Sequence, residues 1–473
     1  MATSFRHRLT AAKNTILEAR TREAIEVEKS LHFDQHIAIN SAQAVMLAEV
    51  GMLTAAERDA IVAALEEISA AGPAELNPAG DEEDLFSVVE GALIRRCGVE
   101  VAGKLHTGRS RNDYYMAVAR LAVKQETELL IAEIAALIDQ LLVAADNYAG
   151  QIFPGYTHNS QQAQPVSLGH FFLAHADAFQ RDLDRHTAAL ARVDLSPLGA
   201  AALGGTDFPL DRGRVAELLG FAGVVENTQD AAGIRDFQLE TAGNTLTLML
   251  NANRLVEALI LYNTAEFGLI SVDDSLMGVS SIMPQKRNPV ALEYVEVATS
   301  QALAGLVSAA MTLKSTTIGM SEEAISIDDT IVKTSAEARY AVGVLRSIVA
   351  GVRVNEARVD EVLRAGFFTV TQLADFLVAA GEMPFRVAHT VVALAVTELT
   401  SAGLDLSTAA GRAQLISALR IHAAAETGTD IAASDDELEH TLDPAAIVLA
   451  RTLPGGPGEI EVRRMVAART QAA

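Results

Sequence analysis

Three polar segments of this 473-residue chain carry residue types that could perform chemistry. The first, Lys104–Asp113, gathers cations, hydroxyls and an amide just before a long helical pattern. Ser110 or Asn112 could cap that helix, so the segment taken alone favours a capped helix start with surface arginines. The alternative is a carboxylate site. There Arg111 would supply a bidentate fork at a positive helix end, and Ser110 and Asn112 would add further donors.

The second segment runs from Pro154 to Pro165 and contains a histidine among hydroxyls and amides. A lone histidine is more often structural than catalytic. Here His158 follows Thr157 and precedes a cluster of amides that includes Gln164, in a loop rather than on an apolar face. That context favours a polar site without excluding a structural role.

The third segment, Gly278–Pro289, joins a serine pair, a Met-Pro turn, a lysine and an amide. An ordinary polar loop could have this composition. The functional alternative is a mobile lid that carries a nucleophile or base, Ser280 or Ser281, and a cation, Lys286, for a substrate anion. All three segments offer donors to carboxylates.

Metal and nucleotide chemistry lack support in the sequence. There is no P-loop, GxGxxG, HExxH or GxSxG motif, and the single Cys97 excludes a CxxC site and an intrachain disulfide. We expect no metal and no cofactor. The net charge of −24 would repel a phosphate backbone, so we expect no nucleic-acid partner. The charged N-terminus and the interrupted apolar runs predict a cytoplasmic protein without a membrane span.

The elements that must position these segments are helices. Apolar residues recur at three- and four-residue steps at Leu130, Ile134, Leu137, Ile138, Leu141 and Leu142, which predicts one buried helix face. Residues 235–270 and 303–313 have a similar character, and strand signals are weak. Proline and glycine clusters suggest three domains, 1–108, 109–360 and 361–473, with the long helices in the second. The core is rich in alanine, so we expect long helices packed along their length or between chains.

The serine-lysine loop identifies a family resemblance. Ser280-Ser281-x-Met283-Pro284-x-Lys286-x-Asn288-Pro289 resembles the signature loop of the aspartase/fumarase superfamily. Within that superfamily the chain is most similar to argininosuccinate lyase, whose motifs are matched by Ala102–Asp113, Pro154–His158, Ala163–Pro165, Pro197–Gly199, Arg235–Phe237 and Met383–Arg386. The resemblance covers nearly the whole chain. It implies an all-α, three-domain protomer and a homotetramer with a twenty-helix core, in which three subunits contribute to each active site.

The implied reaction is a reversible anti β-elimination of fumarate from an N-substituted L-aspartate, through an aci-carboxylate intermediate and without a cofactor. The resemblance gives Ser280 the role of base. It implies that Ser281, Lys286 and Asn288 bind the dianion that develops on the substrate. His158, paired with Glu293, would assist from the other side. The succinyl carboxylates and other parts of the substrate would be held by Ser110, Arg111, Asn112, Thr157, Gln164, Arg235 and Met283.

The amine end departs from the argininosuccinate lyase pattern. Val290 replaces an aspartate, and Met320, Ile325 and Asp328 stand where that family has Tyr, Gln and Lys around the arginine portion. Losing several polar partners together would cost orders of magnitude in specificity for arginine. We therefore expect another amine, as in the similar lyases for ethylenediaminedisuccinate. The alternatives are argininosuccinate lyase itself and a non-catalytic member like the lens crystallins, although the retained signature loop speaks against the latter.

Overall fold

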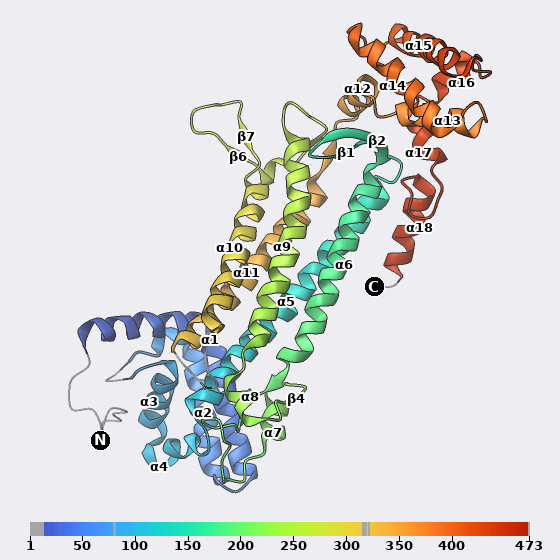
Figure 1. The fold of residues 1–473 in the computed structure, drawn as a ribbon. Helices are drawn as coiled ribbons and strands as arrows, with labels where there is room; N and C mark the ends of the chain where they lie inside the picture. Colours follow the sequence, from blue (N-terminus) through green and yellow to red (C-terminus); the bar gives the residue numbers. More distant parts are fainter. Residues whose placement is uncertain (1–13, 79–81, 315–318, 320–321, 472–473) are drawn as a thin grey trace. The chain divides into compact units, whose positions relative to one another are not determined.

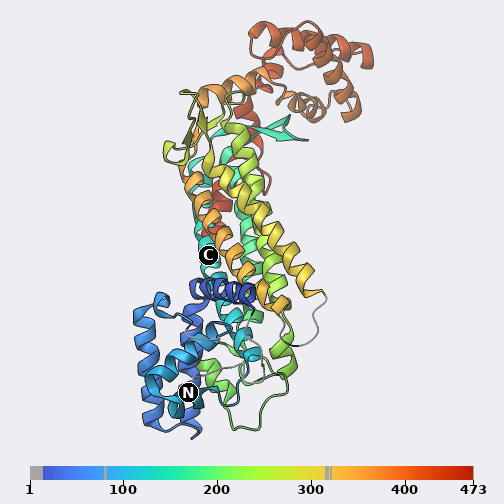
Figure 2. The same ribbon diagram turned by 90° about the vertical axis from the view of Figure 1, so that its left-hand side faces the viewer.

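The protein is described by a computed structural model covering residues 14–78, 82–314, 319 and 322–471. Five long helices dominate it: α5 (Arg111–Asn147), α6 (Leu168–Val193), α9 (Asp236–Asn263), α10 (Val290–Leu313) and α11 (Glu322–Gly351). Figures 1 and 2 both show them running side by side. The strands are short, the longest having seven residues. The predicted all-α class is confirmed.

The packing of the chain divides it into two units. Unit 1 comprises Met1–Glu133, Asp182–Leu250 and Val297–Tyr340, and unit 2 comprises Ile134–Arg181, Asn251–Glu296 and Ala341–Ala473. Each of the five long helices is divided between the two. The three domains expected from proline and glycine clusters stay a prediction.

Unit 1 adds a further long helix, α1 (Thr15–Glu49), to its parts of the five helices. Its shorter elements are α2 (Ala55–Ala71), η1 (Pro73–Glu75), α3 (Leu85–Cys97), α4 (Val99–Ala102), η2 (Gly103–His106), α7 (Arg212–Leu218) and α8 (Thr228–Gly233), with the parallel strands β3 (Leu195–Ser196) and β4 (Gly223–Val224). One core joins α1, α2, α3 and the start of α5 around residues such as Ile39, Leu65 and Leu93. A second joins the five long helices through Met116, Val193, Phe237, Ala309 and Ile331.

Unit 2 holds the remaining strands and the C-terminal helices. The strands are β1 (Ile152–Thr157), β2 (Gln161–Ser167), β5 (Ile270–Ser271), β6 (Gly278–Val279), β7 (Arg287–Asn288) and β8 (Arg353–Val354), and the 3₁₀ helix is η3 (Asp274–Leu276). The helices are α12 (Glu356–Ala365), α13 (Val370–Ala379), α14 (Phe385–Ser401), α15 (Ala409–Thr427), α16 (Asp435–His440), α17 (Pro444–Ala450) and α18 (Glu459–Thr470). The helices α13 to α16 share their own core (Figure 1).

The strands of unit 2 form three antiparallel pairs, which are β1 with β2, β5 with β8 and β6 with β7. The β1–β2 hairpin interrupts the helices at Phe153–Gly155, where the Pro-Gly pair predicted a break. Its register shifts between Pro154 and Tyr156. Both the hairpin and the β6–β7 loop lie at the same end of the unit 2 helices (Figure 1).

Helical periodicity predicts burial well on α5, where Leu130 to Leu142 of the predicted face are all buried. On α9, Leu255 and Leu259 are buried but Leu250 is half exposed. Helix α10 is long and apolar enough to cross a membrane, yet only 33% of its most apolar window is buried. Among the described residues, α12 and α13 also pass this test of length and composition, as a bent pair. Much of the apolar surface of α10 is therefore exposed in the single chain.

Candidate active site

The start of α5 is built as a capped helix end with a paired arginine. The Asn112 N–H donates to Ser110 Oγ at 3.3 Å, and the Asn112 side chain donates to the Ala202 carbonyl at 2.7 Å. Arg111 Nε lies 2.8 Å from Asp84 Oδ2, and its guanidinium lies over the Phe86 ring. Asp84 is also the N-cap of α3. The helix is thus capped, as one alternative from the sequence had it, and Arg111 pairs with a carboxylate of the chain itself; the carboxylate-binding alternative stays a prediction.

Asp113 organises the loop that faces this helix end, a role that sequence reasoning missed. Its buried carboxylate accepts N–H bonds from Ser110 at 3.0 Å, Gly199 at 3.0 Å and Ala201 at 2.9 Å. Burial raises the pKa of Asp113 to about 6, although these backbone donors and Arg109 oppose the shift. The signal in the sequence was an aspartate in the first turn of a helix, a position that favours negative charge.

His158 lies at the tip of the β1–β2 hairpin. It and the next two residues, Asn159 and Ser160, have φ values of 46°, 55° and 72°, in the left-handed region that non-glycine residues rarely adopt. Thr157 pairs with Gln161 at the base of this turn, and Gln164 follows on β2. Thr157 and His158 are exposed. Strained backbone of this kind clusters at functional sites, because the surrounding structure must maintain it.

Ser280 is the best-positioned nucleophile of the β6–β7 loop. Its Oγ accepts two backbone N–H bonds, from Met283 at 3.0 Å and from Ile282 at 3.3 Å. The Lys286 N–H closes a turn onto the Met283 carbonyl at 3.0 Å. Around them the loop is open: Ser281 and Lys286 are exposed, and Ile282 is 82% exposed. Two N–H groups aimed at one hydroxyl oxygen would stabilise negative charge on it.

The base of this loop is tightly packed. Asn288 on β7 pairs with Gly278 on β6, and a Cβ added to Gly278 would lie 2.7 Å from Val290 Cγ1. Glu293 follows in the first turn of α10 and is exposed. Among the residues that the structure describes, no side-chain contact joins Glu293 to His158. The pair that the resemblance implied is therefore not formed within one chain.

The predicted amine end contains a buried ion pair. Arg235, just before α9, donates to Asp328 on α11, and the Gln238 amide donates to the same oxygen at 2.5 Å. All three side chains are buried. Burial raises the pKa of Asp328, while the charge of Arg235 opposes the shift. Ile325 lies one turn earlier on α11 and is half-buried, whereas Met320 lies outside the described residues.

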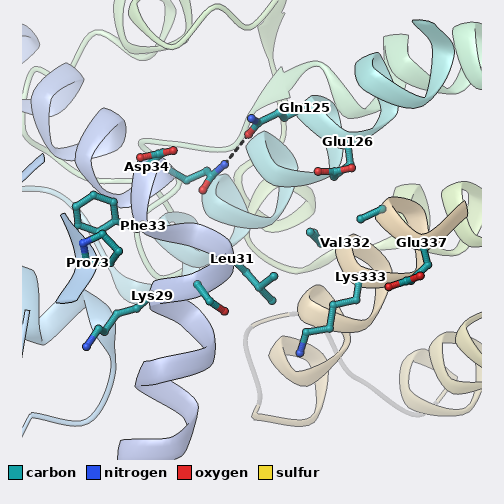
Figure 3. Close-up of a pocket in the computed structure, with 13 residues that line it drawn as sticks. Lys29, Leu31, Phe33, Asp34, Pro73, Gln125, Glu126, Val332, Lys333 and Glu337 are labelled. Atoms are coloured by element: carbon teal, nitrogen blue, oxygen red, sulfur yellow. Dashed lines mark hydrogen bonds between the residues drawn. The ribbon is translucent and has the colours of Figure 1, made fainter. Parts of the chain in front are cut away.

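A separate pocket of about 440 Å³ lies in unit 1 between α1, α5 and α11 (Figure 3). Its lining carries charges of both signs, the cations Lys29 and Lys333 and the carboxylates of Asp34, Glu126 and Glu337. The Gln35 amide donates to Gln125 Oε1 at 3.0 Å across it. None of the predicted site residues lines this pocket.

The candidate residues fall into two groups by unit. Unit 1 holds Ser110, Arg111, Asn112, Arg235, Ile325 and Asp328, and unit 2 holds Thr157, His158, Gln164, Ser280, Ser281, Met283, Lys286, Asn288, Val290 and Glu293. The structure brings Arg235 and Asp328 into contact. Gly278, at the base of the loop that carries Ser280, lies against Val290. Sequence reasoning missed Gln238, although its place one turn after Arg235 was a usable signal.

Known protein families match most of the chain. Residues 8–304 match the family described as lyase, and residues 367–448 match the one described as argininosuccinate lyase C-terminal. The argininosuccinate lyase of Methanothrix thermoacetophila is 38% identical over 92% of this chain and 86% of its own. Argininosuccinate lyase 2 of Agrobacterium fabrum is 34% identical over 96% of this chain and 89% of its own.

Solved structures share the fold. A variant of EDDS lyase with bound fumarate superposes with a TM-score of 0.83 and 29% identity, over 98% of this chain and 90% of its own. The class II fumarase of Schistosoma mansoni superposes with a TM-score of 0.73 and 17% identity, over 91% of this chain and 94% of its own. The latter likeness concerns the fold alone.

Proposed function

Since the chain belongs to the aspartase/fumarase superfamily and is a carbon–nitrogen lyase of the argininosuccinate lyase type, we propose that it eliminates fumarate reversibly from an N-substituted L-aspartate. Ser280 removes the Cβ proton, and the electron pair passes into the adjacent carboxylate as an aci-carboxylate. That intermediate then expels the amine in an anti elimination. The amine nitrogen takes up the C–N electron pair and a proton, so no cofactor is required.

The hydrogen bonding of Ser280 is the observation that carries this proposal. A serine hydroxyl is a weak base at its ordinary pKa, so its alkoxide must be stabilised before it can remove a carbon-bound proton. The Met283 and Ile282 N–H groups already donate to Ser280 Oγ in the free chain. Lys286, three residues beyond Met283 on the same loop, adds a positive charge once the loop closes over the substrate.

The remaining residues bind charge that develops away from Ser280. Ser281, Lys286 and Asn288 hold the dianion, since they combine a hydroxyl, a cation and an amide on one loop. His158 assists from the opposite side of the substrate with Glu293. The substrate is positioned by Ser110, Arg111, Asn112, Thr157, Gln164, Arg235, Met283, Val290, Met320, Ile325 and Asp328.

The protein acts as a cytoplasmic homotetramer in this proposal, with each site shared by three subunits. One face of α10 in unit 1 carries Val297, Leu303, Val307 and Met311, each more than half exposed in the single chain. Burying such a face on another copy removes apolar surface from water and accounts for a helix that would otherwise be apolar and solvent-facing. The His158–Glu293 pair would then form between subunits, because it is not formed within one.

The proposal is tested by incubating the purified protein with fumarate and a panel of amines while following the loss of fumarate absorbance. We expect consumption with at least one amine, and a decrease of roughly 10³-fold or more on Ser280→Ala. Ser275→Ala, on η3 before the loop, is the matched control and should retain activity. No consumption with any amine, in either reaction direction, would refute the assignment.

Argininosuccinate cleavage is the second candidate, favoured by the relatives of that name at 32–38% identity. The buried Arg235–Asp328 pair speaks against it, because Asp328 is already occupied where that family has a lysine for the arginine portion. Release of fumarate from argininosuccinate faster than from every other N-substituted aspartate tested would establish this candidate over ours.

A further inference from the structure

A pocket in unit 1 is lined by none of the residues to which the proposed reaction gives a role. Its volume is about 440 Å³, and α1, α5 and α11 form its walls together with Pro73 of η1 (Figure 3). A second pocket of about 270 Å³ shares Asp34, Gln35 and Gln125 with it, so the two adjoin between α1 and α5. Sites for small molecules measure roughly 300–1,000 Å³, and the first pocket falls within that range.

An amide pair lines both pockets. Gln35 is 8% exposed, and its amide nitrogen donates to Gln125 Oε1 at 3.0 Å. Among the residues that the structure describes, this is the only hydrogen bond that either side chain forms. Turning both amides over would make Gln125 the donor, so in either orientation the pair leaves one carbonyl oxygen and one NH₂ group unused. A ligand in the pocket thus meets an acceptor and a donor whichever way the amides face.

Several charged side chains in the walls are already paired. Their ion pairs are Lys29–Glu26 at 2.7 Å, Glu126–Arg339 at 3.2 Å and Lys124–Asp194 at 2.6 Å. Each pair is close to neutral as a unit, so it attracts a charged ligand only weakly. The charge that a ligand meets therefore comes from the other ionisable side chains of the lining.

Those side chains are one cation, Lys333, and three carboxylates, Asp34, Glu128 and Glu337. Lys333 on α11 and Asp34 on α1 are exposed, and neither forms an ion pair with another residue of the described ranges. Glu128 lies 3.9 Å from Lys124. The excess of carboxylates repels a dicarboxylate and attracts an ammonium group. One free charge of each sign, on two different helices, suits a ligand that carries both an ammonium and a carboxylate.

The rest of the lining of the larger pocket is mostly apolar. It comprises Leu31, Phe33, Pro73, Val332 and Ala336, with Ser30 as the exception. The Ser30 hydroxyl already donates to the Val27 carbonyl at 2.7 Å. A short apolar group of a ligand would cover this part of the lining and remove both surfaces from water, which is a favourable transfer.

We propose that this pocket binds a zwitterionic α-amino acid with an apolar side chain. The carboxylate of the ligand pairs with Lys333, its ammonium pairs with Asp34, and the unused groups of the Gln35–Gln125 pair hydrogen-bond to both. The apolar side chain lies on Phe33 and Val332. Bound in this way, the amino acid ties α1 to α11 and stabilises the folded chain by mass action. This site is separate from the proposed site of fumarate elimination, and the inference does not depend on that function.

The experiment is calorimetric titration of the full-length protein with L-leucine. Two analogues each lack one charge: isopentylamine has no carboxylate, and isocaproate has no ammonium. We expect L-leucine to bind with a Kd of about 0.1–10 mM, and both analogues to bind at least about tenfold more weakly. Lys333→Met and Asp34→Asn should each weaken the binding of L-leucine by about 3- to 10-fold, and Gln35→Leu by about tenfold. Asp139→Asn is the matched control, since Asp139 is exposed on α5 outside both pockets and should leave the Kd unchanged.

A second titration of L-leucine, in the presence of saturating succinate, separates this site from the proposed active site. An unchanged Kd supports two distinct sites, whereas displacement of L-leucine by succinate overturns the inference. The absence of any heat with L-leucine overturns it as well and indicates that only water fills the pocket. Binding of isopentylamine or isocaproate as tight as that of L-leucine, or equal binding to the wild type and to folded Lys333→Met and Asp34→Asn, would rule out recognition of a zwitterion. Each of these results leaves the lyase assignment intact.

Discussion

The buried Arg235–Asp328 pair offers a sharp test of how the proposed amine end is built. Asp328→Leu removes a carboxylate that accepts from both Arg235 and Gln238, and it leaves the Arg235 guanidinium buried without a counter-charge. The double variant Arg235→Met/Asp328→Leu removes both charges. The single variant should be strongly destabilised and the double variant much less so.

The magnitude follows from the burial of the two side chains, which are 3% and 6% exposed. Breaking a buried ion pair from one side costs about 3–5 kcal/mol, because an uncompensated charge remains. The freed Gln238 donor adds about 1–3 kcal/mol, less than additively. Burial raises the pKa of Asp328 despite Arg235, so for this carboxylate the cost of desolvation outweighs the attraction of its partner. Removing both charges should therefore cost only about 0–2 kcal/mol.

The assay is urea unfolding followed by circular dichroism at one fixed protein concentration, since the proposed subunit association would link stability to concentration. Asp360→Leu is the control, because Asp360 forms an exposed pair with Arg364 on α12 and should cost below about 1 kcal/mol. A loss below about 1 kcal/mol for Asp328→Leu, or an equal loss for the double variant, would refute the reasoning.

Three further predictions concern other parts of the chain. Burial raises the pKa of Glu28 to about 8, so stability present below pH 4.5 is lost as pH rises towards 8, and Glu28→Gln should flatten that pH dependence of unfolding by roughly 2–5 kcal/mol. Gly278→Ala places a methyl against Val290 and should lower activity, which Val290→Ala should restore in the double variant; failure to restore it would reject the packing account. Asp113→Ala leaves three N–H groups without their acceptor and should lower the free energy of unfolding by about 2–4 kcal/mol, measured by urea titration. An unchanged urea midpoint of unfolding would show that these three hydrogen bonds do not stabilise the fold.

Local patterns in the sequence predicted the helical architecture well. Three- and four-residue spacing of leucines is a property of one helix, so the buried face of α5 could be read before any packing was known. Proline and glycine predicted the break at Phe153–Gly155, because both limit the backbone locally. The exposure of Leu250 and of the α10 face was not predictable in this way. Periodicity marks a face that must be covered and does not say by which chain.

In the candidate site, too, local sequence patterns predicted some features and only the tertiary structure decided others. The serine-lysine loop was recognisable because its residues are close in sequence. The sequence could not show that the Met283 and Ile282 N–H groups aim at Ser280 Oγ, since that depends on backbone direction within the loop. Nor could it show that His158 stands in a strained turn of three left-handed residues.

Contacts between residues far apart in the sequence were decided by the tertiary structure alone. Asp328 entered as a replacement for lysine at the amine end, and the fold makes it the partner of Arg235, 93 positions away. Gln238 and His32 attract no attention in the sequence, because an isolated amide or imidazole on a helix is usually structural. Their significance arises only when α1, α9 and α11 pack together and bring Gln238 to Asp328 and His32 to Asp329. The sequence by itself thus determined the helices, the family and the loop that carries Ser280. Folding decided which distant charges neutralise one another, because electrostatic partnership depends on distance and burial.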